Sequence, residues 1–76
     1  MKEFIEYIAK YLVDKPNEVL VTEIVGESTI ICELRVDQTD IGKVIGKHGQ
    51  TAKSMRVIIA AASAKRGKRS VFQILE

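Results

Sequence analysis

The sequence predicts an α+β fold with elements in the order αββααβ, in which three helices pack on one face of a three-stranded mixed sheet. Apolar residues recur at helical spacing in segments 3–13 and 50–65. Segments 19–25 and 29–36 are rich in β-branched residues, and a third such segment, 70–75, follows only after the helical region. A crossover of that length favours parallel pairing of the second and third strands.

The first helix is expected over residues 3–13. Ile5, Ile8 and Leu12 share one face of it, with Phe4 and Tyr11 beside them. A proline at position 16 ends the helix, because the residue before a proline disfavours helical backbone angles.

Segments 19–25 and 29–36 form a predicted antiparallel hairpin around the Gly26-Glu27-Ser28 turn. Successive side chains of the second segment are expected to point to opposite faces of the sheet, and one of these faces is entirely apolar, with Ile30, Cys32, Leu34 and Val36. We therefore place Cys32 in the core. A single cysteine excludes both a disulfide framework and a cysteine-built zinc site.

The next segment is expected to hold two helices separated by glycines. Thr39 or Asp40 is the expected N-cap of a short helix that ends at Ile45. A longer helix runs from Gln50 to about Lys65, followed by a glycine C-cap at position 67. It carries two apolar stripes, one of Met55, Ile58, Ile59 and Ala62 and the other of Val57, Ala61 and Ala64. The second stripe either packs on the N-terminal helix or forms a protein interface.

Length and composition fit one domain, residues 1–76, with 46% hydrophobic and 29% charged residues. The net charge of +2 hides a split: residues 1–38 carry four bases against eight acids, and residues 39–76 carry eight bases against two. A basic half points to a polyanionic partner. The longest apolar run, Val57 to Ala62, is too short to cross a bilayer, and no signal-peptide core is present. We expect a cytoplasmic protein without membrane insertion.

The segment 40–50, DIGKVIGKHGQ, places a G-x-x-G pair between the two predicted helices. Glycines at such a position permit a sharp turn and let a phosphate backbone approach without meeting a Cβ atom. The following helix starts with unpaired N–H groups, which attract anions. Lys43 and Lys47 add positive charge, and Lys53 and Arg56 lie one turn apart farther along. The apolar face of Ile41, Val44 and Ile45 is shared between the core and a groove for unstacked bases.

The longer pattern I-G-K-V-I-G-K-x-G resembles the GXXG loop of KH domains, which clamps four nucleotides of single-stranded RNA or DNA. The element order resembles the type II (prokaryotic) KH fold over essentially the whole chain. The length, the Lys15-Pro16 turn and the D-x-G-K-V-I-G-K-x-G-x-T-A-K run resemble the small stand-alone bacterial KH proteins of the KhpA family. One departure is Ala52, where many KH domains have a larger aliphatic residue, which implies a shallower or differently packed groove.

The resemblance implies a single-stranded RNA-binding protein that acts as an RNA chaperone or post-transcriptional regulator. It also implies a homodimer, or a heterodimer with a larger Jag-like KH protein, and a link to cell elongation, cell wall biogenesis and envelope growth. The candidate RNA-binding residues are Ile41, Gly42, Lys43, Ile45, Gly46, Lys47, His48, Gly49, Gln50, Lys53 and Arg56.

Two other functions fit the same residues: a protein–protein adaptor and a ribosome-assembly factor with a KH-like fold. Catalysis is not expected, because His48 is the only histidine and the loop lacks the full G-x-x-x-x-G-K-[ST] pattern of nucleotide hydrolases. We expect no cofactor and no metal. The basic run Lys65-Arg66-Gly67-Lys68-Arg69 is either a second phosphate contact or only a soluble connection. Tyr7 and Tyr11 lie far from the loop in sequence, which disfavours a role in base stacking.

Overall fold

The computed structural model of the chain describes residues 1–75 and confirms the predicted architecture. The helices and strands are α1 (Lys2–Leu12), β1 (Leu20–Val25), β2 (Thr29–Arg35), α2 (Ile41–Ile45), α3 (Gln50–Lys65) and β3 (Arg69–Leu75). Three short 3₁₀ turns lie between them: η1 (Pro16–Glu18), η2 (Gln38–Asp40) and η3 (Lys47–Gly49). The observed boundaries differ from the predicted ones by about one residue.

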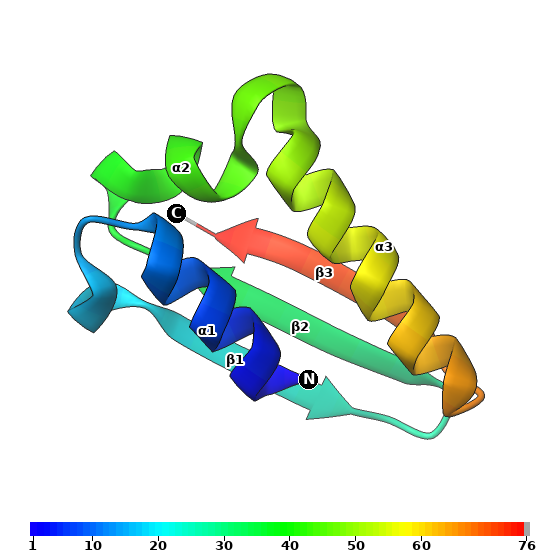
Figure 1. The fold of residues 1–76 in the computed structure, drawn as a ribbon. Coiled ribbons are helices and arrows are strands. Elements are labelled where there is room, and N and C mark those ends of the chain that lie inside the picture. The colour runs from blue at the N-terminus through cyan, green and yellow to red at the C-terminus, as the bar shows by residue number, and fades with distance from the viewer. Residues whose placement is uncertain (76) are drawn as a thin grey trace.

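The sheet has the strand order β1-β2-β3, with β1 and β2 antiparallel and β2 and β3 parallel (Figure 1). Val21 is paired with Leu34 across the first ladder, and Cys32 with Phe72 across the second. The parallel pairing confirms the crossover expected from the two helices between β2 and β3. Both outer strands of this sheet leave one edge without a strand partner in the described chain.

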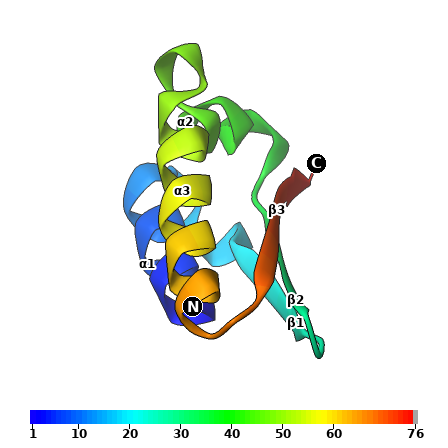
Figure 2. The same ribbon diagram turned by 90° about the vertical axis from the view of Figure 1, so that its right-hand side faces the viewer.

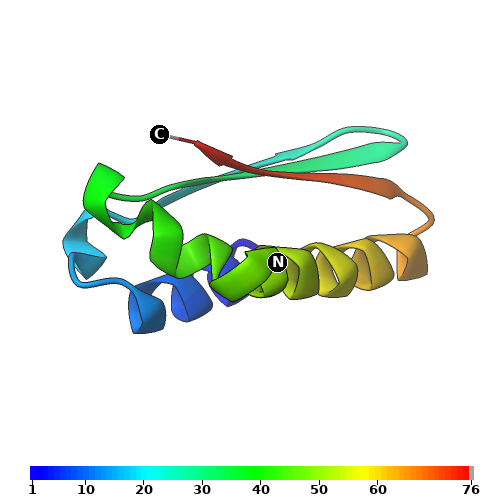
Figure 3. The ribbon, with the colours of Figure 1, turned by 90° about the horizontal axis from the view of Figure 1, so that it is seen from above.

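All three helices lie on one face of the sheet, so the molecule has two layers (Figure 3). The core between the layers contains Ile5, Ala9, Val13, Val21, Ile30, Cys32, Leu34, Val36, Val44, Met55, Ile59 and Phe72. The alternation predicted for the second strand is confirmed, since its four inward residues are all buried. Burial also raises the pKa of the Cys32 thiol, and the nearby Glu23 carboxylate adds to this.

The face of α3 that packs on the sheet differs from the predicted one. The buried residues are Ala52, Met55, Ile59 and Ser63, whereas Ile58 and Ala62 are exposed. A serine at position 63 masks this face in the sequence, because a polar residue interrupts the apolar pattern. The second stripe does not pack on α1: Val57 is 62% exposed, and Ala61 and Ala64 are exposed as well.

Asp40 precedes α2 as predicted, but its carboxylate does not cap that helix. Asp40 is fully buried, and its two oxygens accept the backbone N–H groups of Asp14 (3.2 Å) and Lys15 (3.0 Å), just after α1. The capping bond is made one turn earlier, where the Asp37 carboxylate accepts the N–H of Thr39 at 3.0 Å. Asp40 therefore fastens the end of α1 to the start of α2.

The C-cap predicted at Gly67 is confirmed. Gly67 has a φ of 72°, and the N–H groups of Gly67 and Lys68 donate to the carbonyl oxygens of Ala64 and Ser63. These two bonds form a Schellman motif, which ends α3 and turns the chain into β3. Within residues 1–75, no helix is long and apolar enough to cross a membrane.

Candidate nucleic-acid interface

The Gly46–Gly49 segment links α2 to α3 and projects beyond the sheet at one end of the molecule (Figure 2). Three of its four residues have a positive φ: Gly46 (82°), His48 (55°) and Gly49 (73°). His48 is the one non-glycine residue with a positive φ in the described chain. Left-handed backbone is uncommon for a non-glycine residue, and histidine is among those that tolerate it.

The three glycines in and beside the loop differ in what their positions require. A Cβ atom on Gly46 would lie 2.2 Å from Thr51 Oγ1 and 2.9 Å from Thr51 N, so Thr51 allows no side chain there. A Cβ on Gly49 or on Gly42 would meet no atom within 4 Å. Gly49 has left-handed backbone angles, which favour glycine, whereas Gly42 is helical and faces open space.

The loop exposes backbone hydrogen-bond donors as well as side chains. Its Gly46 and Gly49 amides donate to the carbonyl oxygens of Gly42 (2.9 Å) and Gly46 (3.0 Å). The amides of Lys47 and His48 make no backbone hydrogen bond to any residue in 1–75, and both side chains are exposed. Two unpaired amides followed by the first turn of a 16-residue helix favour the binding of an anion.

The positive charges of the site fall into two groups. Lys47 and Lys53 are exposed and form no ion pair with any described residue. Lys43 instead lies 3.3 Å from an Asp14 carboxylate oxygen and 3.5 Å from one of Asp40. Asp14 and, secondarily, Asp40 raise the pKa of the Lys43 ammonium, so its charge is already balanced within the protein. Its predicted contact with a phosphate stays a prediction.

The predicted groove residues lie on and beside α2. Ile45 is 39% exposed, Gly42 is exposed and Ile41 is half-buried. Val44 is fully buried and belongs to the core alone, so only part of the apolar face of α2 is open to a ligand.

The other candidates lie on α3. Gln50 is exposed on the first turn. Arg56 lies farther along α3 and contacts Phe72 of β3 twice. Its Nη2 donates to the Phe72 carbonyl at 3.4 Å, and its guanidinium lies 5.7 Å from the centre of the Phe72 ring. Ten of the candidates thus cluster around the loop and the first turns after it, and Arg56 marks the seam between α3 and β3.

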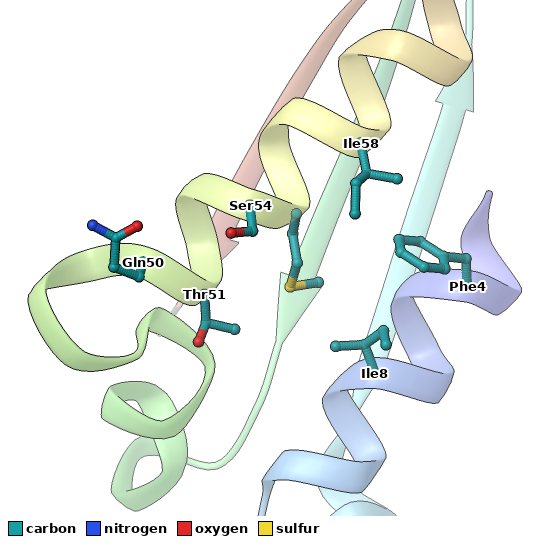
Figure 4. A pocket seen from close by; sticks show the side chains of 7 residues that line it. Phe4, Ile8, Gln50, Thr51, Ser54 and Ile58 are labelled. Atoms are coloured by element: carbon teal, nitrogen blue, oxygen red, sulfur yellow. The ribbon is translucent and has the colours of Figure 1, made fainter.

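The sequence reasoning missed a groove between α1 and α3. It begins beside the loop and continues as a second hollow, with volumes of about 310 Å³ and about 260 Å³ that share Phe4 and Ile58. Figure 4 shows Phe4 and Ile8 pointing from α1 toward Ile58 of α3. The loop end of the groove is polar, with Gln50, Thr51 and Ser54. One feature of the sequence could have indicated the groove. Phe4 is apolar but lies beside the stripe of α1 that packs into the core, so it leaves apolar surface next to that stripe.

No group of three or more metal-ligating side chains is present among residues 1–75.

Comparison with known proteins identifies the family. A family model described as "KhpA/KhpB, KH domain" matches residues 2–74. A Clostridium perfringens protein named RNA-binding protein KhpA is 52% identical over 75 residues, covering 99% of this chain and 100% of that protein. The protein of the same name from Aquifex aeolicus is 51% identical over 76 residues, covering 100% and 96% of the two chains. The one from Borreliella burgdorferi is 46% identical over 74 residues, covering 97% and 90%.

No solved structure matches the chain significantly. Membership of a family whose relatives carry the name of an RNA-binding protein agrees with the prediction that the chain is not an enzyme. The αββααβ order, the glycine-bounded loop between α2 and α3, and full-length identity near 50% lead to one conclusion: the chain belongs to the KhpA family of KH-domain proteins.

Proposed function

We propose that this protein binds single-stranded RNA through the Gly46–Gly49 loop. The observation that carries the proposal is the backbone of that loop: the amides of Lys47 and His48 are unpaired within residues 1–75 and lie directly before the N-terminus of α3. Those donors hold phosphate oxygens, and the free ammonium groups of Lys47 and Lys53 add attraction. The names of the relatives support RNA as the polyanion.

The nucleotide bases of the bound RNA lie beside α2, where Gly42 leaves open space and Ile45 offers apolar surface. KH loops bind four nucleotides, and so small a contact predicts weak, salt-sensitive binding with modest sequence preference. Lys43 contributes less than Lys47, because two carboxylates already hold its charge.

The test replaces both loop side chains, Lys47→Asp and His48→Asp, and measures binding of short single-stranded RNA. Two carboxylates at the loop repel phosphate, so we expect RNA affinity to be lost while the circular dichroism spectrum stays that of the wild type. The matched control is Lys2→Asp with Lys10→Asp on α1, which makes a similar change in charge away from the loop. A folded loop variant that binds RNA as well as the wild type would contradict the proposal.

A second candidate function, protein–protein association, is favoured by the α1–α3 surface. Ile58 is 50% exposed, and next to it lie the apolar groove and the strip of Val57, Ala61 and Ala64. We propose that a second copy of the chain covers this face, because a small domain gains stability from burying exposed apolar area in a symmetric dimer. Association with a larger Jag-like KH protein on the same face is the alternative outcome.

Light scattering on Val57→Glu tests this association. We expect the wild type to be a dimer and Val57→Glu to be a monomer, since the new charge would be buried in the interface. Val71→Glu, a similar exchange on the open face of the sheet, is the control and is expected to stay dimeric. If the wild type is monomeric alone but pairs with a larger KH protein, the proposal of a homodimer is overturned in favour of the heterodimer.

The roles in RNA chaperoning, post-transcriptional regulation and cell elongation belong to the same proposal and rest on the resemblance to the family. Crosslinking of bound RNA in cells separates them from the ribosome-assembly alternative. Many crosslinked transcripts support a chaperone or regulator, whereas cosedimentation with ribosomal subunits and crosslinks confined to ribosomal RNA support an assembly factor.

A further inference from the structure

His48, at the exposed end of the molecule, has a backbone conformation that disfavours a side chain. Its angles are φ 55° and ψ 25°, which are left-handed. Left-handed backbone brings the Cβ atom close to the following carbonyl oxygen, so few residue types other than glycine adopt it. Non-glycine residues held in such conformations cluster at binding sites. The exception at position 48 therefore points to a use for the imidazole.

The imidazole of His48 is exposed and has no partner within the molecule. It forms neither a hydrogen bond nor an ion pair with any of residues 1–75. The charged groups that surround it on the loop, on α2 and on α3 are cations, namely Lys47, Lys43 and Lys53. The carboxylates that contact α2, those of Asp14 and Asp40, lie 3.3 and 3.5 Å from the Lys43 ammonium. A negative charge that pairs with a protonated imidazole therefore comes from a ligand.

A phosphate held by the loop lies close to this imidazole. The N–H of His48 is one of the two unpaired amides of the proposed phosphate site. An oxygen that accepts this N–H lies about 2.9 Å from the nitrogen, and the side chain starts at the next backbone atom, about 1.5 Å away. The nearer ring nitrogen is thus about 4–7 Å from that oxygen in any rotamer. At this distance a positive charge on the ring attracts the phosphate.

We propose that protonated His48 pairs with an RNA phosphate at the loop, so that RNA affinity rises as the pH falls. The inference rests on the proposed RNA binding at Gly46–Gly49 and adds proton linkage to it. Histidine is the side chain whose charge ordinarily changes between pH 5 and 8, and His48 is the only histidine in the sequence. A bound phosphate favours the charged imidazole, and by linkage the charged imidazole favours binding to the same extent.

The experiment measures the affinity of a short single-stranded RNA from about pH 8 to about pH 5.5 at constant ionic strength. The RNA has hydroxyl groups at both ends, because a terminal phosphate titrates in the same range. The test variant is His48→Asn, since asparagine is uncharged and tolerates left-handed backbone. It keeps every other titratable group, so a difference in pH dependence from the wild type belongs to His48. His48→Lys is the matched variant that stays charged across this range.

We expect wild-type affinity to rise about tenfold over this pH range, as attraction between two charges about 5 Å apart near a protein surface predicts. Most of this rise should be absent from both His48→Asn and His48→Lys. A wild type with the same pH dependence as His48→Asn would overturn the inference and leave RNA binding at the loop intact. Failure of the wild type to bind RNA at any pH would instead overturn the proposed function, and the proton linkage with it.

A second measurement needs no variant. The imidazole protons of a single histidine give one set of nuclear magnetic resonance signals, which can be followed against pH without and with saturating RNA. Because a tenfold change in affinity corresponds to about one pH unit, bound RNA should move this titration about one unit toward higher pH. A titration that RNA leaves in place would contradict the pairing of His48 with a phosphate.

Discussion

At the scale of single residues, the glycines around the loop are under different constraints, and only one is free to change without strain. A Cβ atom on Gly46 would lie closer to Thr51 than van der Waals contact allows, and Gly46 has a φ of 82°, so any side chain there distorts the loop. Gly42 has neither constraint, since it is helical and open to solvent. A glycine with no structural reason on an exposed helix points to close approach by a ligand.

Gly42→Ala is therefore expected to stabilise the protein and weaken RNA binding. Alanine favours the helix over glycine by about 0.5–1 kcal/mol, and its methyl group occupies space that a bound base needs. Thermal melting measures the first effect, and RNA titration measures the second. Gly46→Ala is the matched contrast, with both stability and binding lowered. Undiminished RNA affinity in Gly42→Ala would show that no base comes close to α2 at this position.

Ser63 carries the second prediction at this scale. Its hydroxyl is fully buried and has no hydrogen-bond partner in residues 1–75. An unpaired buried polar group costs about 1–3 kcal/mol, so we expect Ser63→Ala to raise the free energy of unfolding in urea by about 1 kcal/mol. Ser54→Ala on the exposed side of α3 should change it by only a few tenths of a kcal/mol. A less stable Ser63→Ala would mean that the hydroxyl has a partner after all.

At the scale of elements, the order of helices and strands could be predicted from local patterns, whereas their attachments could not. Alternation along β2 and the glycine after α3 are local signals, and both predictions are confirmed. Asp40 was assigned the local role of an N-cap, but its partners lie 25 and 26 residues away in sequence. The pairing of Lys43 and the α1–α3 groove escaped prediction for the same reason, since both depend on how α1 sits beside its neighbours.

Acid should weaken the attachment of α1 to α2. Burial on its own raises the pKa of the Asp40 carboxyl, but the Asp14 and Lys15 amides and the Lys43 ammonium outweigh it, so the pKa lies below its usual value. A lowered folded-state pKa adds stability above the unfolded-state pKa of about 3.9, and this stability is lost as the pH falls below it.

We therefore expect Asp40→Asn to melt at a lower temperature than the wild type at pH 7, with the difference shrinking as the pH falls from about 4 toward 2. Asp14→Asn is the control, because Asp14 is exposed and, among residues 1–75, its carboxylate forms an ion pair with Lys43 alone. Asp37, whose pKa is lowered by the Thr39 hydroxyl and amide, keeps some acid sensitivity in both variants. A gap between Asp40→Asn and wild type that stays constant down to pH 2 would contradict this account.

At the scale of the whole molecule, charge is arranged for a partner more than for the fold. The apolar core and the sheet hold the layers together, and the ion pairs among described residues involve few side chains. The positively charged side chains along α3 repel one another in the free protein, and the phosphates of bound RNA would neutralise their charge. Salt is therefore expected to affect folding and RNA binding with opposite signs, because it screens repulsion in the first case and attraction in the second.

Raising the salt concentration from 50 to 200 mM should leave the melting temperature of the free protein unchanged or slightly higher. Over the same range RNA affinity should fall about 50-fold if four phosphates are neutralised, since a single strand contributes about −0.7 per contact to the salt slope. A ligand that binds only the folded state raises the melting temperature according to its concentration relative to Kd. Thermal melting with and without RNA at both salt concentrations thus measures both effects, and an RNA-induced stabilisation that survives 200 mM salt undiminished would show that contacts to bases, rather than to phosphates, dominate the binding.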